Sequence, residues 1–169
     1  MMRRLYMLVI IACGALLQQA LPGPAFFGGI KPPILAAMAV HHALRKGDPD
    51  FLIAILFAAL LQDGLELGSF GPALLAFPVM GLVARRIRNE IFSDGLVTQL
   101  VLGAAMGLFT MLTALLIYTV TKQRSVPGVI VLMRLMGSTL LGMATLPIVS
   151  RSVNGLESLI PKRRAYGWQ

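Results

Sequence analysis

Residues 51–70 read FLIAILFAALLQDGLELGSF, an apolar stretch that carries two acidic side chains near its end, Asp63 and Glu66. A helix needs about 20 mostly apolar residues to cross a bilayer. A charged side chain at the centre of such a helix costs about 2.5 kcal/mol or more, so it needs a partner or a function. The stretch therefore predicts a membrane helix that carries a specific polar site.

Composition extends this prediction to the whole chain. Of its 169 residues, 57% are hydrophobic and 13% are charged, whereas a soluble domain carries about 25% charged residues. The net charge of +8 does not indicate a nucleic-acid partner, because the basic residues cluster at the ends of apolar segments. The single cysteine excludes an intramolecular disulfide and a multi-cysteine metal site. We expect no metal or other cofactor.

Six apolar segments predict an all-α integral membrane protein, a six-helix transmembrane bundle in a single domain over residues 1–169. Proline- and glycine-rich turns separate the segments. The second and fourth segments are short and contain prolines or glycines, so whether they span fully stays open. The segments lie near residues 5–21, 30–44, 51–69, 72–84, 96–121 and 128–149, and a basic cytoplasmic tail is expected at residues 150–169.

The distribution of Lys and Arg predicts that both termini are cytoplasmic. With the N-terminus inside, eleven basic residues lie on the cytoplasmic side and three lie outside. The cytoplasmic set includes Arg85, Arg86 and Arg88, for which an orientation signal is a sufficient explanation. The first segment also has features of a secretory signal peptide. Five further apolar segments favour a retained first helix.

The polar cluster has a predicted partner in the last segment. Gln62, Asp63 and Glu66 share one face of a helix. Asp63 and Arg134 each lie six residues from the outer end of their segments, roughly 9 Å deep at 1.5 Å per residue. We therefore expect Arg134 to pair with Asp63. A structural ion pair is the favoured interpretation, and a ligand or ion site is the alternative.

Other candidate residues have simpler interpretations. We expect His41 and His42 to lie at the membrane interface near a helix end, because adjacent residues on a helix point in different directions and do not favour joint metal ligation. No nucleophile elbow, zinc-protease, phosphate-loop or dinucleotide motif is present, so we expect no enzyme. Five glycines are expected to pack against neighbouring helices: Gly64, Gly68, Gly71, Gly103 and Gly107.

A short first helix is followed by Lys31-Pro32-Pro33, a helix ending in Leu60-Leu61-Gln62-Asp63, the turn around Gly68-Ser69-Phe70-Gly71, and a helix closing with Arg85-Arg86-Ile87-Arg88. The order of these features resembles the MreD family of rod shape-determining membrane proteins. Asp63 matches an Asp of that family's third helix, Phe70-Gly71 matches its Leu-Gly-like pair, and Pro147 fits the closing segment. Gln62, Gly64 and the additional Glu66 depart from the family pattern.

The resemblance implies a fold and a function. The family's fold is similar to that of the substrate-binding (S) components of energy-coupling-factor vitamin transporters. By resemblance, the chain would be a non-enzymatic scaffold of the peptidoglycan elongation machinery in the bacterial inner membrane. It would bind MreC and other elongation-complex proteins as well as membrane lipid.

Two other functions stay open. A vitamin-like ligand could be bound by a transporter subunit of the same fold, with polar groups supplied by the cluster around Asp63. The sparse aromatic residues and short external loops weigh against it. An ion-coupled carrier ranks last, because the two halves of the chain show no internal repeat.

Overall fold

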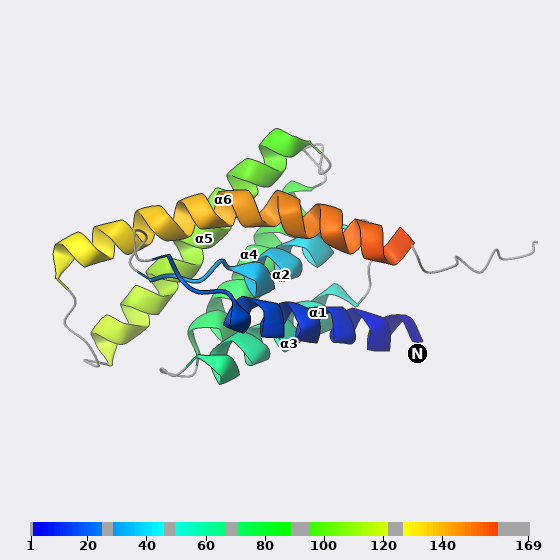
Figure 1. Ribbon diagram of the computed structural model, residues 1–169, viewed down its shortest axis with the longest axis horizontal. Coiled ribbons are helices and arrows are strands. Elements are labelled where there is room, and N and C mark those ends of the chain that lie inside the picture. Colours follow the sequence, from blue (N-terminus) through cyan, green and yellow to red (C-terminus); the bar gives the residue numbers. More distant parts are fainter. Residues whose placement is uncertain are drawn as a thin grey trace, which may run out of the picture.

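The computed structural model describes residues 2–24, 29–45, 50–66, 71–88, 95–121 and 127–158, and this part of the chain is helical without any strand (Figure 1). The predicted all-α fold of six helices is confirmed. In chain order the helices are α1 (Met2–Ala20), α2 (Ile34–Leu44), α3 (Phe51–Leu65), α4 (Pro72–Ile87), α5 (Leu96–Val120) and α6 (Gly128–Ser158).

Several boundaries differ from the prediction, and α2 begins at Ile34 rather than near residue 30. Helix α3 ends at Leu65, because Glu66 already has an extended backbone. Helix α4 continues beyond residue 84 to Ile87, and its last turn carries basic side chains that are favourable at a helix C-terminus. Helix α6 continues to Ser158, so the prediction that the tail begins at residue 150 is wrong. The continuation is packed, because Val153 on this segment is buried.

Helix α2 is the centre of the structure. All eleven of its residues are buried, and it contacts each of the other five helices. At 1.5 Å per residue it is only about 16 Å long, which is shorter than the hydrocarbon core of a bilayer. A helix that is apolar on every side belongs inside a protein core or a membrane. The second apolar segment is therefore a short central helix.

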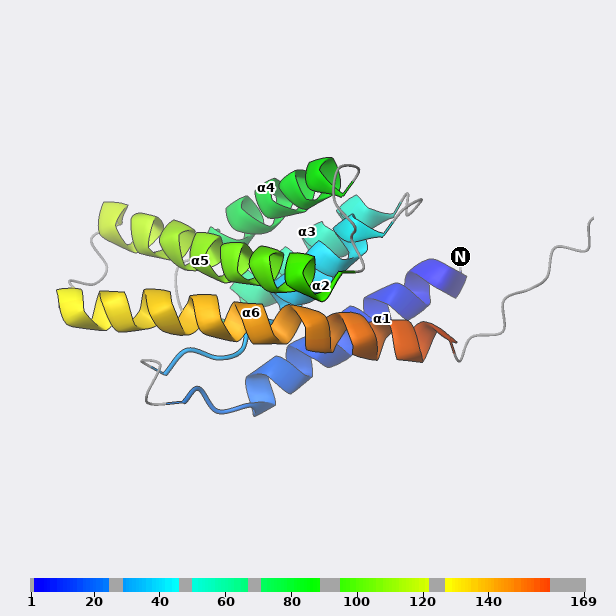
Figure 2. The same ribbon diagram turned by 90° about the horizontal axis from the view of Figure 1, so that it is seen from above.

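Helices α5 and α6 pack along each other beside this centre (Figure 2). Among the described residues, these two helices are long and apolar enough to cross a membrane, over Leu96–Val120 and Gly128–Leu156. Their backbones approach closely at Gly103 and Gly107, where an added Cβ atom would collide with backbone carbonyl groups of α6. Both glycines therefore permit the contact, as the sequence predicts.

One end of the bundle gathers several of the basic residues. The Arg4 guanidinium forms an ion pair of 2.8 Å with Asp50, and Arg85 lies 4.1 Å from the ring centre of Phe51. The hydroxyl of Tyr6 donates to the carbonyl of Leu156 at 3.2 Å, which places the start of α1 beside the end of α6, as Figures 1 and 2 also show. The polar cluster of α3 consequently lies at the opposite end.

Candidate functional site

A cavity of about 340 Å³ lies at the end of the bundle that holds the polar cluster. Every helix contributes to its walls. The four residues of the predicted cluster, Gln62, Asp63, Glu66 and Arg134, all line it. The cavity therefore brings together two segments that are some seventy residues apart in the sequence.

Asp63 caps the N-terminus of α4. Its carboxylate accepts backbone hydrogen bonds from Gly71 (3.1 Å), Ala73 (2.9 Å) and Leu74 (3.0 Å). Pro72, the first residue of α4, has no N–H to offer, so Asp63 accepts from each amide of residues 71–74 that can donate. Gly71 has φ +131°, a conformation that residues with a side chain rarely adopt. Asp63 thus acts as a helix cap supplied from another helix.

The expected ion pair between Asp63 and Arg134 is not formed among the described residues. Both oxygens of Asp63, which is only 5% exposed, are already occupied by the amides of α4. Asp63 therefore binds the N-terminus of α4, where the helix dipole is positive, instead of the Arg134 guanidinium that the sequence predicts. Arg134 is half-buried on the cavity wall, and its buried Nε atom has no hydrogen-bond partner.

A chain of side-chain amides connects Gln62 and Glu66 to α1 and α2. The Gln18 side chain accepts a hydrogen bond from the Leu35 amide at 2.9 Å and donates to the Gln62 Oε1 atom at 2.7 Å. The amide of Gln62 then donates to the carboxylate of Glu66. These bonds connect α1, α2 and α3, and Gln18 is only 3% exposed.

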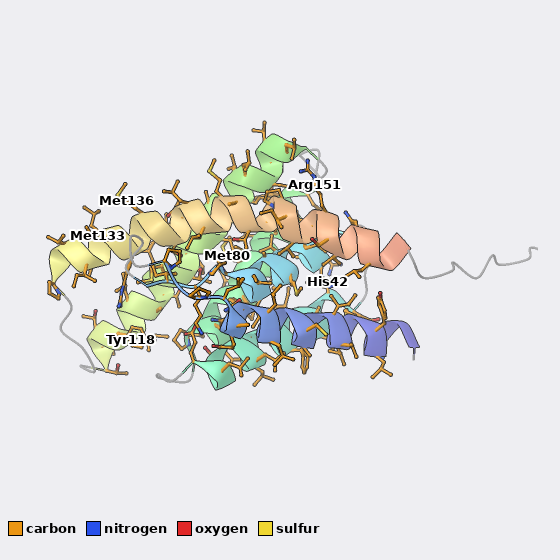
Figure 3. The ribbon with its side chains drawn as sticks, in the orientation of Figure 1. His42, Met80, Tyr118, Met133, Met136 and Arg151 are labelled. Atoms are coloured by element: carbon orange, nitrogen blue, oxygen red, sulfur yellow. The ribbon has the colours of Figure 1, made fainter. Side chains whose placement is uncertain are left out.

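Sequence reasoning missed Gln18 and other cavity residues. The signal for Gln18 was present as a Gln18-Gln19 pair within an apolar helix. Lys31 donates to the side chain of Gln19 at 2.5 Å and connects the rim of the cavity to α1. Thr110, Tyr118 and Ser138 line the cavity from α5 and α6, and Figure 3 shows Tyr118 at the far end of α5. Short hydroxyl side chains in apolar helices carry no signal of this kind.

Two of the five glycines predicted at packing positions have other surroundings. Gly64 is exposed and nothing lies within 4 Å of an added Cβ atom, so its predicted packing role is wrong. Gly71 likewise has open space and serves the turn before α4 instead. Gly68 lies outside the described residues.

The two histidines lie in the last turn of α2, at the helix end that the sequence predicts. His41 and His42 are buried at 4% and 2% exposure, and their position at the membrane interface stays a prediction. The His41 Nδ1 atom and the Ser150 hydroxyl share a hydrogen bond of 2.9 Å that joins α2 to α6. Figure 3 shows His42 within the helix bundle. Both side chains belong to the packed interior.

The basic residues that end α4 have distinct roles. Arg88 donates to the carbonyl of Arg45 at 2.6 Å and to that of Ala43 at 3.3 Å, and so satisfies the C-terminus of α2. Arg85 lies over the Phe51 ring, whereas Arg86 is exposed. Arg88 is therefore structural in addition to any role in orientation.

Comparison with known proteins gives no match: no family model, no curated protein and no solved structure is similar to this chain. The described residues include no group of three or more His, Cys, Asp or Glu side chains that could hold a metal ion. The cavity is lined by the carboxylate of Asp63, which caps α4, by the network of Gln18, Gln62 and Glu66, and by the guanidinium of Arg134. Such an arrangement can bind a polar ligand.

Proposed function

We propose that this chain is a non-enzymatic scaffold in the bacterial inner membrane that binds MreC and helps to organise the peptidoglycan elongation machinery, as the resemblance to MreD implies. The fold is a six-helix membrane bundle similar to the S components of energy-coupling-factor transporters. Both termini lie in the cytoplasm. No nucleic acid takes part.

The gathered basic end supports this orientation. Arg4, Arg45, Arg85 and Arg88 lie at one end of the structure, held by the contacts of Arg4 with Asp50 and of Arg88 with the end of α2. Cytoplasmic ends of membrane helices carry such an excess of Lys and Arg. The polar cavity then opens toward the outer side of the membrane.

The observation that carries the scaffold proposal is an exposed apolar seam on α6. Its members recur at alternating steps of four and three residues, the spacing by which one helix packs along another. Each member is at least 36% exposed, and Figure 3 shows Met133 and Met136 on the outer side of the helix. The seam consists of Val129, Met133, Met136, Leu140 and Met143. It suits the membrane helix of a partner such as MreC.

The cap made by Asp63 gives the family resemblance a physical basis. An Asp at the end of the third helix, followed by a turn that ends in Gly71 and Pro72, is the combination that the cap requires. The carboxylate reaches the free amides of α4, the glycine adopts positive φ, and the proline begins the helix. The resemblance therefore matches a structural need of this bundle.

Co-purification tests the proposal. The full chain, tagged and co-expressed with MreC from the same genome, is expected to retain MreC through detergent extraction and size-exclusion chromatography. The double variant Met133→Ala with Met136→Ala is expected to retain less MreC. The control is Leu112→Ala with Leu116→Ala, which shortens two equally exposed side chains on α5. If both double variants retain as much MreC as the wild type does, the seam is not the binding surface. If the wild-type chain does not capture MreC, the scaffold proposal is rejected.

A vitamin-like ligand for a transporter subunit is the second candidate, and the cavity of about 340 Å³ favours it because ligand pockets begin near this size. A panel of water-soluble vitamins tested by thermal shift on the purified chain discriminates the two. Tight binding of one vitamin together with no capture of MreC would select the transporter subunit.

A further inference from the structure

Arg134 differs from the other polar side chains that line the cavity. Gln18, Gln62 and Glu66 are joined in one network, and Asp63 is bonded to the amides of α4. The remaining polar side chains, Lys31, Thr110, Tyr118 and Ser138, also have interactions within the protein. Arg134 makes no hydrogen bond or ion pair with any described residue, and its Nε atom is buried.

An unpaired guanidinium in this position is unfavourable for the folded chain. Arg134 lies within the second turn of α6, half-buried on the wall of the cavity, and its Nε atom is buried without a partner. A buried N–H group that makes no hydrogen bond has lost its hydration without compensation. Residues that reduce stability in this way are typical of binding sites, where the missing partner is a ligand.

We propose that the cavity binds an amphiphilic ligand whose single anionic group, a phosphate or a carboxylate, is held by Arg134. A guanidinium binds either group through two parallel N–H···O bonds. The carboxylates of Asp63 and Glu66 stand in the same walls and disfavour a ligand with several negative charges. Lys31 is already bonded to Gln19, so Arg134 remains as the anion-binding cation.

The apolar part of the ligand follows from the rest of the lining. Ile30, Phe77, Met111 and Ala114 supply apolar surface to the cavity. An alkyl or ring-bearing body would cover this surface while its acidic head reaches Arg134. Both a phospholipid entering from the membrane and a water-soluble organic acid have this chemistry.

Binding of defined probes to the purified full chain in a neutral detergent tests the proposal. The probes are octyl phosphate, octanoate and dioctanoyl-phosphatidylglycerol, and octyl glucoside is the uncharged control. At least one of the three anions is expected to bind and to raise the melting temperature, and the glucoside is not. Arg134→Gln is expected to weaken binding by about ten- to a hundredfold, because it removes a charge-assisted, bidentate contact. The matched control is Arg151→Gln, an exposed arginine on the same helix at the other end of the bundle.

A second variant keeps the test decisive if Arg134→Gln folds poorly. Arg134→Met retains the length of the side chain without its charge, and without ligand it is expected to melt at a higher temperature than the wild type. Native mass spectrometry distinguishes the two ligand sources: a co-purified phospholipid that Arg134→Met loses indicates lipid, and an empty wild-type chain that binds octanoate indicates a soluble acid. Failure of all three anions to bind, or equal binding by wild type and Arg134→Gln, would overturn the proposal. The outcome is independent of MreC capture.

Discussion

Replacing Asp63 by alanine removes the acceptor of three backbone hydrogen bonds at the start of α4. A hydrogen bond to a charged group contributes about 1.5–3 kcal/mol, and a buried donor that is left without a partner costs about 1–3 kcal/mol. The Ala73 amide is buried, so we assign it about 2 kcal/mol, whereas the partly buried amides of Gly71 and Leu74 regain water and lose about 1 kcal/mol each. The expected destabilisation is therefore about 4 kcal/mol, in the upper range for a single substitution.

Thermal unfolding of the purified chain in detergent, followed by circular dichroism, measures this effect. At 2–4 °C per kcal/mol for a chain of this size, Asp63→Ala is expected to lower the melting temperature by about 8–16 °C. Asp63→Asn keeps an oxygen acceptor without the charge and is expected to lose about half as much. The control is Glu66→Gln, because Glu66 is exposed and, among the described residues, accepts a hydrogen bond only from Gln62.

A loss of less than about 2 °C in Asp63→Ala, or an equal loss in Glu66→Gln, would show that Asp63 does not stabilise the start of α4 as a cap. The charge swap of Asp63→Arg with Arg134→Asp separates the cap from an ion pair. A cap predicts that the double variant is no more stable than Asp63→Arg alone, because an arginine cannot accept hydrogen bonds from α4. If the double variant is more stable than Asp63→Arg alone, an ion pair between positions 63 and 134 is supported instead of the cap.

Two further predictions concern packing and capping elsewhere. Gly103→Ala and Gly107→Ala are each expected to destabilise the chain by about 1–3 kcal/mol, because an added methyl group collides with the backbone of α6. Gly64→Ala, on the open surface of α3, is expected to be neutral or slightly stabilising. Melting temperatures of the three variants measure the difference, and equal losses in all three would contradict the prediction. Arg88→Gln is expected to destabilise the chain by about 1–2 kcal/mol, because its hydrogen bonds to the C-terminus of α2 are lost. Arg86→Gln, at an exposed position, is expected to change stability by less than about 0.5 kcal/mol. Denaturant titration measures both variants, and an unchanged stability in Arg88→Gln would show that these hydrogen bonds contribute nothing.

Much of the helical architecture could be predicted from the sequence, because apolar segments and the breakers between them are local features. The hydropathy of Phe51–Leu65 and the Gly71-Pro72 start of α4 are both visible in the residues alone. The continuation of α6 to Ser158 is less visible, because it depends on burial of Val153 against other helices. Composition also cannot distinguish a spanning helix from a short central one such as α2.

Four members of the candidate site could be predicted from the sequence, whereas Gln18 and other lining residues and the bonding of Asp63 could not. Equal depth along two helices placed Asp63 and Arg134 near the same cavity, which is a matter of helical rise. Their opposite charges predicted an ion pair, because a sequence shows which side chains are present and does not show which backbone amides are left free to bind Asp63. The backbone amides at the start of α4 bind the same carboxylate, and the sequence does not show where they lie relative to α3.

Accessibility labelling tests most directly whether the chain spans the membrane with its basic end inside. In a chain carrying Cys13→Ala to remove the exposed natural thiol, a single cysteine is placed at Arg86 or at Thr121, exposed positions at opposite ends of the bundle. In intact spheroplasts, a membrane-impermeant maleimide is expected to label the cysteine at position 121 and to reach the one at position 86 only after the membrane is permeabilised. Labelling of both positions before permeabilisation would contradict the account.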